Sequence, residues 1–115
     1  MKNSFLFLLL LLSSIAFSQK KIDNLTAKQL LKEKNMQLLD IRTEGEVAQG
    51  KIDGSLHIDY FKSDFLQQCL SSLDKSKPLI VYCAAGGRSA KAAQQLKKNG
   101  FKVVYDLSGG FDNWE

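Results

Sequence analysis

The sequence predicts an α/β domain with a mainly parallel central sheet, and two observations carry this prediction. Short apolar segments typical of buried strands alternate along the chain with segments of helical periodicity. The segment 79–83, LIVYC, is too apolar for either of its faces to meet water, as is usual for a strand covered by helices on both sides. No repeat, low-complexity tract or linker follows residue 18 of the 115-residue chain, so a single domain over 19–115 is expected.

The first 18 residues are predicted to be a secretory signal peptide. Lys2 precedes an apolar stretch at 5–12, and Ala16 and Ser18 put small side chains at the two positions that a signal peptidase recognises. The alternative is a membrane anchor. Segment 5–17 has only 13 residues, two of them serine, whereas a spanning helix needs about 20 apolar residues. We therefore expect cleavage after residue 18, a periplasmic or secreted location, and no membrane attachment of the mature chain.

Two helices and two strands are predicted in the first half of the domain. Capping-box pairs, Thr26 with Gln29 and Thr43 with Glu46, mark the helix starts. The first helix is expected to end near residue 34 and the second at Gly50. The apolar segments that follow the two helices are the expected strands, 36–42 and 56–58.

The second half of the domain repeats this alternation. Ser63 is the expected cap of a helix with one apolar stripe, formed by Phe65, Leu66, Cys69, Leu70 and Leu73. A further helix is expected from Ser89 to Gly100, with Ala92, Ala93 and Leu96 on one face. The expected strands of this half are 79–83, introduced by Pro78, and 102–107.

Cys83 ends the most apolar strand and directly precedes the helix with the clearest apolar face. In open α/β sheets, ligands bind beyond the carboxyl ends of the strands. The four residues after it have almost no side chain: Ala84, Ala85, Gly86 and Gly87. If this segment curls around the sulfur, its amides point inward and form an anion-binding hollow. Glycine permits the backbone angles that such a tight loop needs.

The helix that begins near Arg88 and Ser89 adds its positive end and its unpaired amides to this hollow. Such surroundings lower the pKa of a thiol and favour the thiolate, which is the nucleophilic form. We therefore interpret Cys83 as a catalytic nucleophile, with Arg88 either holding the loop or receiving an anionic substrate. The alternative is that Cys83 is a small buried hydrophobic residue and that Gly86 and Gly87 form an ordinary turn.

Segment 83–89, CAAGGRS, resembles the C-x-x-G-x-R-S loop of rhodanese-like sulfurtransferases. The family's D-x-R, E, G-H-I and G-A succession is similar to segment 38–59, with matches at Asp40, Arg42, Glu46, Gly50, Ile52 and Gly54. The family's closing G-G-x-x-x-W is similar to segment 107–114, with matches at Gly109, Gly110 and Trp114. The resemblance covers roughly 24–115. It departs from the pattern at Lys51, where the family usually has His, and at Ser55, where Ala is common.

The resemblance implies a single rhodanese domain, an α/β fold with a five-stranded parallel sheet flanked by helices. It implies that Cys83 takes a sulfane sulfur from thiosulfate or a persulfide donor and holds it as a persulfide within loop 84–89. A thiol, a partner protein's thiol or cyanide then accepts the sulfur. No metal or organic cofactor is expected, and the chain is expected to act as a monomer. Asp40 and Arg42 could be site groups, but the resemblance suggests an ion pair that supports the loops.

The spacing between cysteine and arginine distinguishes sulfur from phosphate chemistry. Related phosphatase and arsenate reductase loops place five residues between the two, whereas here only the four residues 84–87 intervene. A shorter loop closes a smaller ring of amides, which suits one sulfur atom better than a tetrahedral oxyanion. Two functions other than catalysis stay open: a sulfur or redox carrier that docks to another protein, and a non-catalytic binding module.

The remaining candidates have simpler interpretations. Cys69 is expected to pack in the core, although a resolving thiol or a disulfide with Cys83 stays open. His57 is interpreted as scaffold rather than as a general base. The net charge of +4, which becomes +3 without Lys2, comes mostly from scattered lysines, so no nucleic-acid partner is expected.

Overall fold

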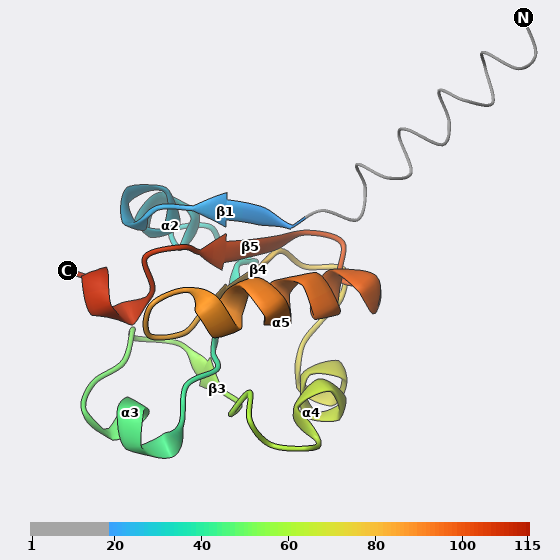
Figure 1. Cartoon of the computed structure of the whole chain (residues 1–115). Coiled ribbons are helices and arrows are strands. Elements are labelled where there is room, and N and C mark those ends of the chain that lie inside the picture. The colour runs from blue at the N-terminus through green and yellow to red at the C-terminus, as the bar shows by residue number, and fades with distance from the viewer. Residues whose placement is uncertain (1–18) are drawn as a thin grey trace, which may run out of the picture.

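Five parallel strands form a single sheet in the computed structural model, which describes residues 19–115 (Figure 1). Their order across the sheet is β1-β5-β4-β2-β3. The strands are β1 (Lys20–Ile22), β2 (Gln37–Asp40), β3 (Leu56–His57), β4 (Leu79–Tyr82) and β5 (Val104–Leu107). The predicted α/β fold with a five-stranded parallel sheet is therefore confirmed, whereas the signal peptide predicted for 1–18 lies outside the described residues.

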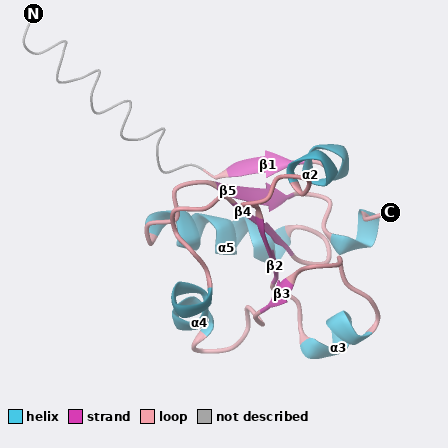
Figure 2. Ribbon diagram, turned by 180° about the vertical axis from the view of Figure 1, so that it is seen from behind, coloured by secondary structure: helices cyan, strands magenta, loops and turns pink. Residues whose placement is uncertain are grey.

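Helices cover both faces of this sheet. They are α2 (Asn24–Leu30), α3 (Glu44–Ala48), α4 (Phe65–Ser72), α5 (Gly87–Lys98) and a short 3-10 helix, η1 (Phe111–Asn113). In Figure 1 α5 lies in front of the sheet, and in Figure 2, seen from behind, it lies beyond the strands. None of the helices within 19–115 combines the length and the apolar character that crossing a membrane would require.

The central strand β4 supplies side chains to two separate cores. Leu79 and Val81 belong to the core under α4 and α5, while Ile80 and Tyr82 belong to the core on the α2 side. All four residues are fully buried. This alternation follows from the two-residue period of a strand, and it places the next residue, Cys83, on the α4 and α5 side.

The predicted starts of the helices were right only in part. The capping box of Thr43 and Glu46 is present at the start of α3. The one predicted at Thr26 was wrong, because the Asp23 carboxylate accepts a hydrogen bond from the Thr26 amide and starts α2 at Asn24. Ser63 was also wrong as a cap, since Asp64 occupies that position before α4.

Two further differences concern α5 and β1. Helix α5 begins at Gly87, two residues before the expected Ser89, because Gly86 turns the chain with a φ of +108°. Strand β1 was not predicted as a separate element. It has only three residues, and two of them are the exposed lysines Lys20 and Lys21, which are typical of a solvated segment.

Cys69 lies on the buried face of α4 and is fully enclosed. Burial raises the pKa of its thiol from 9.0 to about 12. Within residues 19–115 both cysteines are free, so the structure contains no disulfide between Cys69 and Cys83. The predicted packing role is confirmed, and an enclosed thiol with this pKa is poorly suited to a resolving role.

Replacing Cys69 with alanine should lower the free energy of unfolding by about 1–2 kcal/mol, because the fully buried sulfur loses its packing partners. Urea denaturation measures the difference. Leu70→Ala on the same helix, where the side chain is 37% exposed, is the matched control and should cost less. A Cys69 thiol that is alkylated as fast in the folded protein as in urea would contradict its assignment to the core.

Candidate active site

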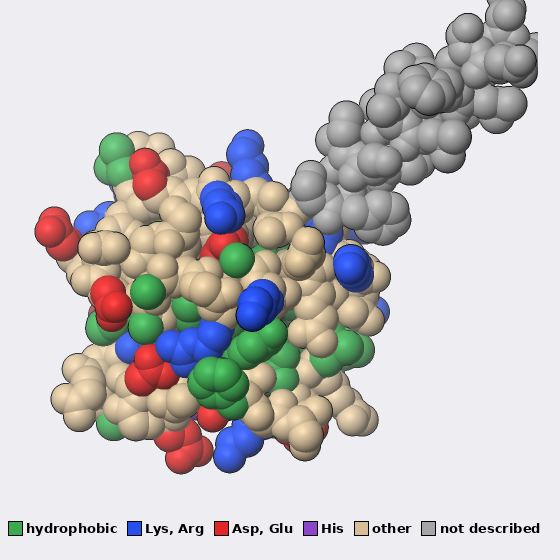
Figure 3. Space-filling model, viewed as in Figure 1, with side chains coloured by type: hydrophobic (Ala, Val, Ile, Leu, Met, Phe, Trp, Pro, Cys, Tyr) green, Lys and Arg blue, Asp and Glu red, His purple; other side chains and the backbone are tan. Residues whose placement is uncertain are grey.

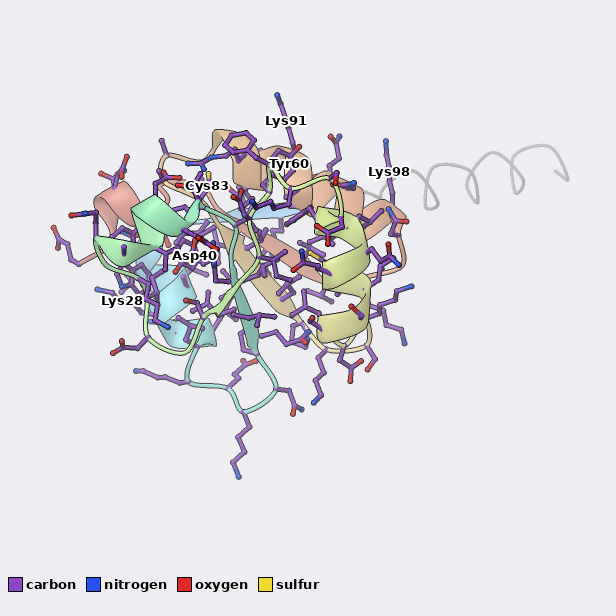
Figure 4. All side chains as sticks on the ribbon, turned by 90° about the horizontal axis from the view of Figure 1, so that it is seen from below. Lys28, Asp40, Tyr60, Cys83, Lys91 and Lys98 are labelled. Atoms are coloured by element: carbon purple, nitrogen blue, oxygen red, sulfur yellow. The ribbon has the colours of Figure 1, made fainter. Side chains whose placement is uncertain are left out.

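Cys83 follows β4 at the carboxyl end of the sheet and begins the loop that leads into α5. The residue is 1% exposed. In Figure 4 Cys83 and Asp40 lie left of the middle of the domain, and Lys98, the last residue of α5, lies on its right side. The best-formed helix of the domain therefore starts at the cysteine loop and runs away from it.

Main-chain amides of the loop point at the Cys83 sulfur. The Gly86 amide donates to Sγ at 3.1 Å and the Ser89 amide at 3.4 Å. Burial raises the pKa of Cys83, but hydrogen bonds from the Ser89 side chain and from the amides of Ser89, Gly86 and Ala85 outweigh burial, so the pKa is lowered overall. The loop thus brings together an enclosed sulfur and donors that stabilise its ionised form.

Two glycines let the loop and the C-terminal turn pass within van der Waals contact of each other. Gly86 has a φ of +108°, and a Cβ there would lie 2.4 Å from the Ser108 carbonyl oxygen. Gly110 has a φ of +64°, and a Cβ there would lie 2.3 Å from the Ala84 carbonyl oxygen. Both positions therefore require glycine for conformation and for space.

The C-terminal turn also fixes the cysteine loop by main-chain hydrogen bonds. The Phe111 amide donates to the Cys83 carbonyl at 2.8 Å, and the Asp112 amide donates to the Ala84 carbonyl at 2.9 Å. The start of the loop is therefore anchored by residues nearly thirty positions later in the chain. This explains the need for Gly110, the second glycine of the closing Gly-Gly pair.

Arg88 projects toward α3 rather than toward the sulfur. Its guanidinium forms a bidentate ion pair with Glu46, with both nitrogen–oxygen distances at 2.8 Å. It also lies over the ring of Phe61, 5.4 Å from the ring centre, and Phe61 is 67% exposed. Below α5 in Figure 3, basic, acidic and hydrophobic side chains adjoin one another on the surface. The sequence analysis assigned no role to Phe61, because its position between Tyr60 and Lys62 matches no distinctive pattern.

Asp40 and Arg42 form a buried ion pair at the carboxyl end of β2. The shortest distance, between Arg42 Nη2 and Asp40 Oδ2, is 2.7 Å. Tyr82 donates its hydroxyl proton to Asp40 Oδ2 at 2.8 Å, and Arg42 donates to the Gly50 carbonyl at 2.8 Å. The guanidinium also lies 4.2 Å from the centre of the Phe111 ring. These contacts join β2, β4, the loop at Gly50 and the C-terminal turn; a supporting role for the pair stays a prediction.

Ser89 and Asp106 are brought together beside the sulfur. Ser89 Oγ lies 3.5 Å from Cys83 Sγ and 2.6 Å from Asp106 Oδ1. Asp106 is 1% exposed, and burial raises its pKa. The sequence analysis missed Asp106, although one signal was present: a carboxylate within the otherwise apolar segment 103–107.

His57, at the end of β3, hydrogen-bonds through Nε2 to the Arg42 carbonyl at 2.6 Å. That contact fits the predicted scaffold role. In the part of the chain that the structure describes, His, Cys, Asp and Glu side chains nowhere gather in a group of three that could hold a metal ion.

Residues 23–115 match the family model described as the rhodanese-like domain. The chain belongs to this family. The curated relatives include the thiosulfate sulfurtransferase GlpE of Coxiella burnetii, which is 38% identical over 96 residues, covering 84% of this chain and 87% of the relative. GlpE of Pseudomonas aeruginosa is 40% identical over 85 residues, covering 73% of this chain and 74% of the relative. The resemblance inferred from the motifs is therefore confirmed at the level of the family.

Solved structures agree with this assignment. A rhodanese-like domain protein from Staphylococcus aureus aligns with a TM-score of 0.72 and 32% identity, covering 84% of this chain and 92% of that chain. A human single-domain sulfurtransferase aligns with a TM-score of 0.68 over 84% of this chain and 96% of that chain. Its identity is 22%, so it shows the shared fold alone.

Replacing Gly110 with alanine should destabilise the site, because the new Cβ would overlap the Ala84 carbonyl at an unfavourable φ. The backbone angle alone costs about 1–3 kcal/mol. Chemical denaturation gives the loss of stability, and iodoacetamide labelling should show slower reaction of Cys83 in the folded variant. Gly109→Ala is the matched control, since a Cβ there first meets the movable Asn113 side chain at 3.3 Å. Equal stability of the two variants would contradict the close approach of the two loops.

The ion pair of Arg88 and Glu46 should make stability depend on acid pH. The hydrogen bond from Arg88 lowers the pKa of Glu46 from 4.5 to about 2. The pair therefore contributes fully above pH 4.5, and the contribution is lost as the pH falls toward about 2. Urea denaturation across this range should show the wild-type protein losing stability relative to Glu46→Gln. Glu44→Gln, on the exposed side of the same helix, is the control and should keep the wild-type slope.

Proposed function

We propose that this protein is a sulfurtransferase that moves a sulfane sulfur through a persulfide on Cys83. The donor is thiosulfate or a persulfide, and the acceptor is a thiol or cyanide. One observation carries the proposal: the Gly86 and Ser89 amides both point at Cys83 Sγ, at 3.1 and 3.4 Å. Donors held in this way stabilise negative charge on sulfur without having to reorganise during the reaction.

In the loading step, the Cys83 thiolate attacks the outer sulfur of thiosulfate. A new S–S bond forms, the S–S bond of thiosulfate breaks, and sulfite leaves with its electron pair. The negative charge then resides on the outer sulfur of the Cys83 persulfide. In the discharge step, a cyanide ion or an acceptor thiolate attacks that outer sulfur, and the electron pair of the S–S bond returns to Cys83 Sγ. Both steps conserve charge and need no external oxidant or reductant.

The cysteine loop supports both steps because its residues 84–87 have almost no side chains that would fill the space near the sulfur. Its amides and the N-terminal end of α5 provide the partial positive charge that a persulfide anion requires. The short ring of four residues between Cys83 and Arg88 suits a single sulfur atom. No metal or organic cofactor enters these steps, since the cysteine itself carries the sulfur.

Arg88 has a narrower role in this proposal than that of a direct substrate ligand. Its guanidinium is engaged by Glu46, so the arginine holds the first turn of α5 against α3. The hydrogen bond to Glu46 is the main cause of the raised pKa of Arg88, and electrostatic attraction to Cys83 raises this pKa further. The arginine therefore stabilises the anionic site while its hydrogen bonds keep the loop in place.

The enclosure of the sulfur favours a second candidate, a carrier that receives or delivers sulfur on docking to a partner protein. Cys83 is 1% exposed, whereas Phe61 beside Arg88 is 67% exposed. A partner protein that docks on Phe61 would bring its thiol to the surface beside Arg88 and the cysteine loop. In either case we propose that the mature chain, 19–115, acts as a monomer in the periplasm or outside the cell.

Incubating the mature domain with thiosulfate and cyanide should produce thiocyanate, and Cys83→Ser should abolish it because the nucleophile is lost. Thiocyanate formation by the Cys83→Ser variant at the wild-type rate would refute the proposal. Cys69→Ala should retain the activity, which controls for the second cysteine. Intact-mass measurement after thiosulfate alone separates the alternatives. A gain of one sulfur on Cys83 without thiocyanate formation would indicate the carrier, and no gain with no turnover would indicate a binding module.

A further inference from the structure

Asp106 is a buried carboxyl group that the proposed chemistry does not yet use. Its Oδ1 lies 2.6 Å from Ser89 Oγ, and within the described residues its Oδ2 has no hydrogen-bond partner. Ionising this group would leave a charged oxygen buried without a donor, which is costly. The surroundings of Asp106 therefore favour the protonated carboxyl.

The Ser89 hydroxyl connects this carboxyl to the sulfur. Its oxygen lies 2.6 Å from Asp106 Oδ1, 3.2 Å from the Gly86 carbonyl oxygen and 3.5 Å from Cys83 Sγ. A hydroxyl has one proton and can donate it to only one of these atoms. If Cys83 and Asp106 were both ionised, three acceptors would compete for that single proton. A second proton, shared among Cys83, Ser89 and Asp106, removes this competition.

We propose that Asp106 holds, through the Ser89 hydroxyl, the proton that Cys83 gives up when its thiolate forms. The thiol proton passes to Ser89 Oγ, and the hydroxyl's own proton passes to Asp106 Oδ1. The three groups keep a total charge of −1, so no proton needs to enter or leave the enclosed site. Asp106 is thus a positioning residue that acts on the sulfur through Ser89.

This inference rests on the proposed function for its role in turnover. When an acceptor removes the outer sulfur, the S–S electron pair returns to Cys83 Sγ and the thiolate forms again. Asp106 is then still protonated, so Ser89 is free to donate to the new anion. The hydrogen bond is available at the atom where charge develops, which is where it lowers the barrier most.

Charged groups on the neighbouring elements act on Asp106 and on Cys83, the two ends of this hydrogen-bonded series. Lys21 on β1 lies opposite Asp106 in the sheet, and its charge lowers the pKa of that carboxyl. Arg88 on α5 is attracted to Cys83 and favours the thiolate. Two negative charges separated by one hydroxyl disfavour each other, so Cys83 and Asp106 should titrate as a pair in two steps.

The pH dependence of Cys83 alkylation tests this sharing of one proton. The rate for the wild-type protein should rise in two steps, and the rate for Asp106→Asn should rise in one. At neutral pH the variant should react about tenfold more slowly, which corresponds to about one pKa unit, because the thiol must release its proton to solvent. Ser89→Ala should show the same loss, and the double variant should be no slower than either single variant. Asp53→Asn, which removes an exposed carboxylate outside the site, is the matched control.

Faster alkylation in Asp106→Asn would overturn the proposal, because it would mean that an ionised carboxylate had been repelling the thiolate. Infrared spectroscopy adds a readout that a purely structural role would not change. A protonated-carboxyl band should be present at neutral pH, should be lost in Asp106→Asn, and should shift to a lower titration midpoint in Cys83→Ala. Absence of that band from the wild-type protein would also overturn the proposal of a shared proton.

Neither measurement uses a sulfur donor, so the two proposals can fail separately. A protein that shows the two-step profile and the band but forms no thiocyanate would refute the sulfurtransferase and leave the shared proton in place. A protein that forms thiocyanate with a single-step profile and no band would refute the shared proton alone.

Discussion

The site depends on a turn that brings its own amides back to the side chain at which it starts. Gly86 makes this possible with a φ of +108°, and the C-terminal turn secures it through the hydrogen bond from the Phe111 amide to the Cys83 carbonyl. The two segments pack so closely that a Cβ would not fit at Gly86 or at Gly110. The close contact of these two loops is therefore the constraint that places the sulfur and its donors.

Opposing electrostatic effects meet at that sulfur. Burial opposes the thiolate, and the hydrogen bonds of the loop favour it and prevail. Cys69 provides a comparison within the same core: it is equally enclosed, but the only effect on it is burial, which raises its pKa to about 12. The difference between the two cysteines comes from the hydrogen-bond donors around Cys83, which are the Ser89 side chain and the loop amides, rather than from their depth. A position at a strand end, followed by small residues, lets amide donors surround a core cysteine and lower its pKa.

Much of this arrangement could be predicted from the sequence because its signals are local. The apolar segment before Cys83, the glycines after it and the capping box at Thr43 each determine structure within a few residues. Strand β1 could not be predicted as a strand in its own right, since its lysines match a solvated segment and its pairing with β5 depends on residues far along the chain. The pairing of Arg88 with Glu46 and the approach of Asp106 to Ser89 depend in the same way on tertiary contacts. Sequence spacing gives no information about such contacts.

The two outermost strands of the sheet are also its shortest ones. Strand β3 has only two residues, and β1 presents Lys20 and Lys21 to solvent. Short edges and edge lysines are the means by which natural sheets avoid recruiting a strand from another molecule. The edge strands of this sheet are therefore poor templates for aggregation. The two lysines that made β1 hard to predict from the sequence also disfavour edge-to-edge pairing of folded chains.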